Sequence, residues 1–164
     1  MTDPFAVFGL PRRFEIDAPD LQSRYLQMAR LVHPDFAGAD PASQASAMQR
    51  AAQLNEAWRI LSDPLERAAC LLRLLSPGQP NDPAPDPDFL EQVLDWRQRL
   101  SDARAAGNAP ALLALEHELA AQRQTHLAQL TSAFAADPPQ LNQAQQHLAA
   151  LRYLDRILRQ IDME

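Results

Sequence analysis

The chain has 164 residues, a formal net charge of −6 and one cysteine. This length suffices for one or two small domains with their own cores, and the acidic balance argues against nucleic-acid binding. One cysteine excludes an internal disulfide and a cysteine zinc cluster. No apolar run of about 18 residues could span a membrane, and the N-terminus lacks the features of a signal peptide, so we expect a soluble, cytoplasmic protein.

Prolines divide the chain into two halves. Five of the 14 prolines fall between residues 76 and 87, a composition typical of a semi-rigid linker that forms neither helix nor sheet. Neither half shows strand-like alternation, and β-branched residues are scarce. We therefore predict an all-α protein with an N-terminal domain over residues 1–75, a linker over 76–87 and a C-terminal domain over 88–164.

Four helices are predicted in the N-terminal half, and an aspartate precedes each of them. An aspartate side chain accepts hydrogen bonds from the free N–H groups of a first helical turn, where proline is also tolerated. The second and third helices each carry an apolar stripe, so we expect them to pack as an antiparallel hairpin. The start signals are Asp3-Pro4, Asp17, Asp40-Pro41 and Asp63-Pro64. The stripes are Leu21, Tyr25, Met28 and Val32, then Ala47, Ala51, Leu54, Trp58 and Leu61.

His33, Pro34 and Asp35 stand where the second helix should end. Pro34 fixes its own φ and moves the preceding residue out of the helical region, so the helix stops there. The histidine and the carboxylate are then held on a short exposed loop between two rigid helices, a favourable position for function. Arg24 and Arg30 lie on the face of the helix opposite its apolar stripe. The simpler alternative is that Asp35 only caps a helix and that the arginines only solvate its surface.

This arrangement resembles a J domain, the module that stimulates ATP hydrolysis by seventy-kilodalton heat-shock chaperones. The resemblance covers residues 3–75. It also rests on residues 54–67, LNEAWRILSDPLER, which are similar to the third-helix signature of that family. It implies no covalent chemistry and hence no catalytic residue. The loop would dock on the partner ATPase with Asp35 facing a partner arginine, and the two arginines would meet an acidic surface. Many J domains have a lysine after the aspartate, where this chain has Phe36, so a weaker electrostatic contribution is expected.

The C-terminal half is predicted to be a three-helix bundle, because three helical segments follow one another with short connections. The first of them has more apolar surface than one core requires. Leu90 and Leu94 lie about 100° around the axis from its core stripe and form a candidate docking strip for a client protein. The alternative is that both leucines pack against the neighbouring N-terminal domain or only widen the buried face of the bundle. The segments cover residues 87–106, 109–135 and 141–161, and the core stripe is Phe89, Val93, Trp96, Leu100 and Ala103.

The whole chain resembles the HscB family, the J-type co-chaperones of iron–sulfur cluster assembly. Residues 5–11, FAVFGLP, match the family's opening. Residues 89–100, FLEQVLDWRQRL, are similar to its client-binding segment, and residues 151–155, LRYLD, match a late motif. The resemblance implies a J domain joined to a three-helix bundle that binds the scaffold protein on which clusters are built, of the IscU type. It further implies that the J domain delivers this scaffold to a dedicated HscA-like ATPase chaperone.

The resemblance also assigns client binding residue by residue. Glu91 stands where the family favours methionine, and Gln98 stands where it favours glutamate, so the patch loses one apolar contact and one charge. The assigned client-binding residues are Leu90, Leu94, Asp95 and Tyr153, the last of which lies to one side of the core-facing Leu151, Leu154, Leu158 and Ile161.

Two alternative functions compete with this interpretation. A general J-domain co-chaperone with an unrelated client would share the loop and differ only in what the bundle binds. A helical-bundle metalloenzyme would need paired Glu-x-x-His motifs that point inward, and the sequence contains no such pair. Three of its candidate ligands are adjacent on one helix and point in different directions, so we expect no metal, no other cofactor and no enzymatic activity. The candidates are Glu116, His117, Glu118, His126 and His147.

Overall fold

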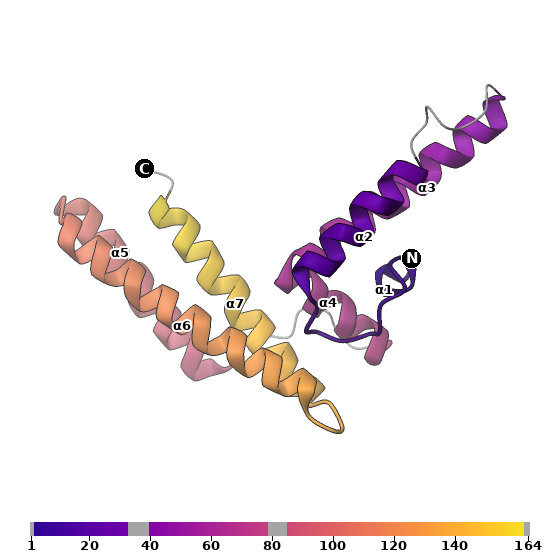
Figure 1. The fold of residues 1–164 in the computed structure, drawn as a ribbon. Coiled ribbons are helices and arrows are strands. Elements are labelled where there is room, and N and C mark those ends of the chain that lie inside the picture. The colour runs from indigo at the N-terminus through magenta and orange to yellow at the C-terminus, as the bar shows by residue number, and fades with distance from the viewer. Residues whose placement is uncertain (1, 33–39, 79–84, 163–164) are drawn as a thin grey trace. The chain divides into compact units, whose positions relative to one another are not determined.

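The computed structural model describes residues 2–32, 40–78 and 85–162, and within these ranges it contains seven helices and no strand (Figure 1). The all-α prediction is therefore confirmed. The chain divides into two compact units, residues 1–71 and 72–164. The predicted linker lies partly outside the described residues. The helices are α1 (Pro4–Val7), α2 (Ala18–Leu31), α3 (Pro41–Ser62), α4 (Pro64–Leu75), α5 (Pro87–Ala105), α6 (Ala109–Ala135) and α7 (Leu141–Asp162).

Aspartate caps begin the N-terminal helices at the predicted places. Asp17 and Asp40 each accept a hydrogen bond from the backbone N–H three residues further on, at 2.9 and 3.0 Å. Asp63 caps α4 in the same way, and Asp3 caps α1 by accepting from the backbone N–H of Phe5, two residues further on. Each cap satisfies a backbone N–H that the first turn of a helix leaves without an intrahelical partner. The predicted starts of these four helices are therefore confirmed.

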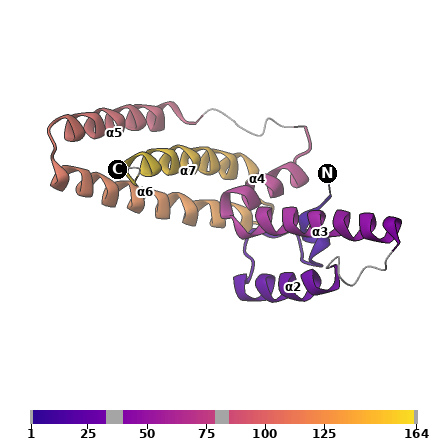
Figure 2. The ribbon, with the colours of Figure 1, turned by 90° about the horizontal axis from the view of Figure 1, so that it is seen from above.

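In the first unit, α2 and α3 lie side by side as the predicted hairpin (Figure 2). The rings of Tyr25 and Trp58 pack with their centroids 4.7 Å apart, and the tyrosine hydroxyl donates to Asn55 (3.0 Å). Helix α3 also buries Ala57 and Ile60 on a face towards α1, which the predicted stripe did not include. Helix α1 has four residues. This is too few for a periodic apolar pattern, so the sequence does not predict its contact with α3. Of the predicted stripe residues, Leu21, Ala47, Leu54 and Leu61 are buried.

In the second unit, α5, α6 and α7 form the predicted three-helix bundle (Figure 2). Its core joins the α5 stripe, which is confirmed, to Leu119 of α6 and Leu154 of α7. Ile157 is fully buried although the predicted α7 stripe omitted it, whereas Leu158 and Ile161 are only partly buried at the margin of the core. Both α5 and α6 pack against α7, so its buried face is wider than a single stripe.

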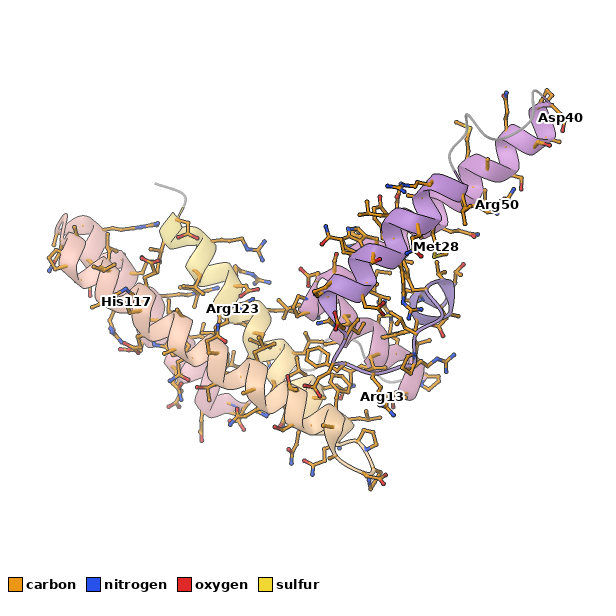
Figure 3. The ribbon with its side chains drawn as sticks, in the orientation of Figure 1. Arg13, Met28, Asp40, Arg50, His117 and Arg123 are labelled. Carbon is orange, nitrogen blue, oxygen red and sulfur yellow. The ribbon has the colours of Figure 1, made fainter. Side chains whose placement is uncertain are left out.

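Polar contacts fasten the three helices of the bundle to one another. The indole Nε1 of Trp96 on α5 donates to Glu118 of α6 (2.8 Å). Arg123 of α6 pairs with Asp155 of α7 at 2.6 Å, and both side chains are mostly buried. Figure 3 labels Arg123 beside α7. These contacts fix the rotation of α5 and α7 about their own axes, and thereby decide which side chains each helix presents to solvent.

Candidate functional site

The helices on either side of the His33-Pro34-Asp35 motif end and begin where the sequence predicts. Helix α2 ends at Leu31, and α3 begins at Pro41. The three motif residues, and Phe36 after them, lie outside the described residues. The described helices therefore set the two ends of the segment that carries the motif, and the role of the motif stays a prediction.

The two candidate arginines of α2 stand in different environments. Arg24 Nε donates to Asp20 (2.8 Å), and its Nη1 donates to the backbone oxygen of Phe8 (3.1 Å), which caps the C-terminal end of α1. Arg30 is exposed in the last turn of α2. Its position six residues further on places it about 120° around the helix axis from Arg24. Arg24 therefore ties α2 to α1, whereas Arg30 is left at the surface, and the two do not form one basic stripe.

Two exposed apolar side chains, on the helices that precede and follow the motif in the chain, were not singled out from the sequence. Leu31, in the last turn of α2, is 81% exposed, and Met48 on α3 is 65% exposed. Each lies one position from a predicted stripe residue, and therefore about 100° around its helix from the hairpin core. An apolar residue outside the core stripe is the sequence signal that could have identified them. They are candidate contacts for a partner that binds the motif.

Leu90 and Leu94 lie one turn apart on α5, and Tyr153 of α7 contacts the residue that precedes Leu90. Leu94 is 66% exposed and Leu90 is half-buried, so Leu94 does not belong to the bundle core. The ring of Tyr153 packs edge to face with that of Phe89, with centroids 6.4 Å apart, at the margin of the core. Because Phe89 directly precedes Leu90, this contact places Tyr153 next to the start of α5. We refer to Leu90, Leu94 and Tyr153 as the apolar patch.

Asp95, the remaining client-binding candidate, lies on the side of α5 that faces α6. It is exposed and pairs with Arg99 (3.3 Å), which also pairs with Glu118 of α6 (2.7 Å). The hydrogen bond from Arg99, and after it the one from Trp96, lowers the pKa of Glu118 and keeps this carboxylate charged. Asp95 therefore belongs to a chain of ion pairs that holds α5 on α6, and only its outer side is left for a partner.

Two histidines of the bundle form a hydrogen-bonded pair that was not predicted. Nδ1 of His126 on α6 lies 3.1 Å from Nδ1 of His147 on α7, and the His126 ring packs edge to face with Phe89. Burial lowers the pKa of both histidines, and His147 lowers that of His126 further. No group of three or more His, Cys, Asp or Glu side chains among the described residues is placed to hold a metal ion. Two of the five residues considered for a metalloenzyme, His126 and His147, thus form a contact between α6 and α7.

Both halves of the chain match known families. Residues 3–70 match the DnaJ domain family. Residues 85–162 match the family described as the HSCB C-terminal oligomerisation domain. Between them, the two matches include nearly all of the described helices and follow each other in the order that the sequence predicted.

Relatives with curated descriptions are similar over most of their length. A "Co-chaperone protein HscB homolog" of Burkholderia mallei (strain SAVP1) is 45% identical over 129 residues, which cover 77% of this chain and 74% of the relative. One of Burkholderia multivorans (strain ATCC 17616 / 249) is 37% identical over 160 residues, which cover 96% and 90%. The similarity therefore extends through both units.

Solved structures share the fold. Chaperone HscB from Vibrio cholerae has a TM-score of 0.85 at 31% identity, with 98% of this chain and 96% of that chain covered. The crystal structure of human co-chaperone protein HscB has a TM-score of 0.88 at 28% identity, with 99% and 82% covered. The likeness extends over nearly the whole chain in both comparisons.

Proposed function

The chain belongs to the HscB family of co-chaperones, which are not enzymes, and we propose on this basis that it delivers an iron–sulfur cluster scaffold protein to an HscA-like ATPase chaperone. Its DnaJ domain implies a partner ATPase of the seventy-kilodalton heat-shock class. One observation above all supports the proposed delivery of a scaffold protein to this ATPase. A J domain and an HSCB C-terminal domain occur in one chain, and the second of them presents an exposed leucine on the helix assigned to client binding.

The J domain would act through His33, Pro34 and Asp35 without covalent chemistry. Asp35 would offer its carboxylate to an arginine of the ATPase in a charge-assisted hydrogen bond, and Pro34 would hold that carboxylate in place beside His33. Arg30, exposed at the end of α2, would accelerate the encounter with an acidic surface. Arg24 would contribute mainly by fastening α2 to α1, since its guanidinium already bonds within the unit.

The bundle would hold the scaffold protein, of the IscU type, through the apolar patch. Leu94 is the central contact, because a leucine that is 66% exposed loses water when a partner covers it. Tyr153 adds an aromatic ring with a polar tip, a side chain common at interfaces. Asp95 would add a negative charge at the rim. None of the described helices is both long and apolar enough to cross a membrane. The curated relatives include one from the bacterium Burkholderia multivorans, and we propose that delivery takes place in the bacterial cytoplasm.

The test is the ATPase rate of the HscA-like chaperone with this protein, with the scaffold protein, and with both. We expect the two together to stimulate hydrolysis by more than the product of their separate effects, because the co-chaperone brings the client and activates the ATPase in one complex. Stimulation by this protein that the scaffold does not change, together with no binding between the two, would instead indicate a general J-domain co-chaperone with an unrelated client.

A further inference from the structure

We propose that the apolar patch lies between two edges of opposite charge, and that Arg97 and Arg156 on the basic edge bind carboxylates of the docked scaffold protein. This inference rests on the proposed function and specifies the chemistry of the client. The scaffold segment it requires has an aliphatic or aromatic side chain for the patch, an acidic group on its α7 side and a basic group on the opposite side.

The two sides of α5 are fixed by contacts with its neighbours. Arg99 pairs with Glu118 of α6, and Arg104 donates to the backbone oxygen of Gln160 of α7. Since each residue turns a helix by about 100°, Arg97 and Arg104 point in nearly the same direction, seven residues apart. Arg97 therefore lies on the side of α5 that faces α7.

The leucines of the patch lie next to Arg97 on the same side. Leu90 precedes Arg97 by seven residues, so the two differ by only about 20° around the axis. Leu94 lies about 60° from Arg97, towards the outer surface of α5. The outer surface of α5 and its side towards α6 carry carboxylates. These are Glu91, Asp95 and Asp102, all exposed, within about 40° of one another.

Arg156 carries the basic edge across to α7. Its guanidinium lies over the ring of Tyr153, with Cζ 5.4 Å from the ring centroid, so its charge is held at the margin of the apolar patch. Any partner side chain that contacts Tyr153 is therefore close to this cation. The edge is thus formed by residues of two helices that share one face of the bundle.

Neither of these two arginines is neutralised within the described part of the unit. Arg99 and Arg123 both pair with carboxylates, whereas Arg97 and Arg156 form no ion pair with another described residue. Both are exposed. Each guanidinium carries a fixed positive charge, and an aspartate or glutamate of the partner can accept a charge-assisted hydrogen bond from it. In a chain of net charge −6, two cations that pair with no described carboxylate and lie beside an exposed apolar patch favour an acidic ligand at this position.

The experiment measures binding of the full-length protein to its scaffold protein at about 0.05 M and about 0.5 M salt. Arg97→Glu with Arg156→Glu should weaken binding by about tenfold or more at the lower salt, mainly through slower association, and by much less at the higher salt. Arg97→Lys with Arg156→Lys keeps both charges and should retain most of the affinity. The matched control is Arg13→Glu with Arg50→Glu, two exposed arginines of the first unit (Figure 3), which gives the same change in net charge.

The outcomes separate this inference from the function on which it rests. If the charge reversal at the patch weakens binding no more than the control, or if the lysine variant loses as much as the glutamate variant, the basic edge has no such role. Leu94→Ala would still weaken binding in that case, and the proposed function would stand. If the unaltered protein does not bind the scaffold at all, both proposals are wrong.

Discussion

The imidazole rings of His126 and His147 meet across α6 and α7, with their Nδ1 atoms 3.1 Å apart. Such a hydrogen bond needs one nitrogen that donates and one that accepts, so it cannot form when both rings are protonated. Burial lowers the pKa of both histidines below the usual value of about 6.5. The folded protein therefore resists protonation that the unfolded chain accepts.

Stability should consequently decrease on mild acidification. The contribution of the pair is fully present above about pH 6.5 and is lost as the pH falls below that value, because the unfolded chain then binds more protons than the folded one. We expect the melting temperature to fall between about pH 7.5 and pH 5.5. His147→Gln, which cannot titrate, should reduce this fall, and His117→Gln on the exposed surface of α6 should not. The same pH dependence in all three proteins would contradict this role of the pair.

Truncation of Leu94 should separate binding from stability. Because Leu94 is 66% exposed, Leu94→Ala should change the free energy of unfolding by about 0.5 kcal/mol or less, yet it should weaken binding of the scaffold. Leu154→Ala is the comparison within the core. Leu154 is fully buried, so its truncation should cost about 2–5 kcal/mol. Denaturant unfolding and a binding titration measure the two effects, and a loss of stability for Leu94→Ala as large as for Leu154→Ala would place Leu94 in the core.

Substitution in the loop should abolish activation without unfolding the protein. His33→Gln or Asp35→Asn removes a proton-carrying ring or a charge while nearly preserving size, so we expect no stimulation of the partner ATPase and an unchanged helical circular dichroism spectrum and melting temperature. Asp17→Asn is a suitable control, since asparagine caps a helix about as well as aspartate does. Full stimulation by either loop variant would rule out the docking role.

The two arginines of α2 should respond differently to removal. Arg24→Ala loses the bonds to Asp20 and to the backbone of Phe8, and should lower the free energy of unfolding by about 1 kcal/mol. Arg30→Ala should leave stability unchanged within about 0.5 kcal/mol. It should nevertheless reduce activation of the ATPase, most clearly at low salt. If Arg30→Ala lowered the free energy of unfolding more than Arg24→Ala does, the contacts of Arg24 would not be the ones that stabilise the first unit.

The helices could be predicted because their signals are local. An aspartate followed by a proline marks the start of α1, α3, α4 and α5, and the caps form at those positions. The separation of Leu94 from the core also follows from helical geometry alone. It lies about 140° around the axis from Phe89, so no single buried face holds both residues.

The features that could not be predicted depend on contacts between segments that are far apart in the sequence. Ile60 is buried by α1, and His126 meets His147 only because α6 and α7 pack in one particular register. Periodicity within a helix contains no information on either contact. For the same reason, Arg24 and Arg30 received the same predicted role. Nothing in the sequence of α2 indicates that Arg24 donates to the backbone oxygen of Phe8, at the end of α1.

The two tryptophans of the chain are divided between its units. Trp58 packs against Tyr25 in the first unit, whereas the indole of Trp96 is buried in the bundle and donates to Glu118. Each half thus contains its own intrinsic fluorophore, in a different chemical environment. With Trp58→Phe or Trp96→Phe, the emission of the remaining indole reports on one half alone, so the order in which the halves melt, and which of them a partner perturbs, can be followed without an attached dye.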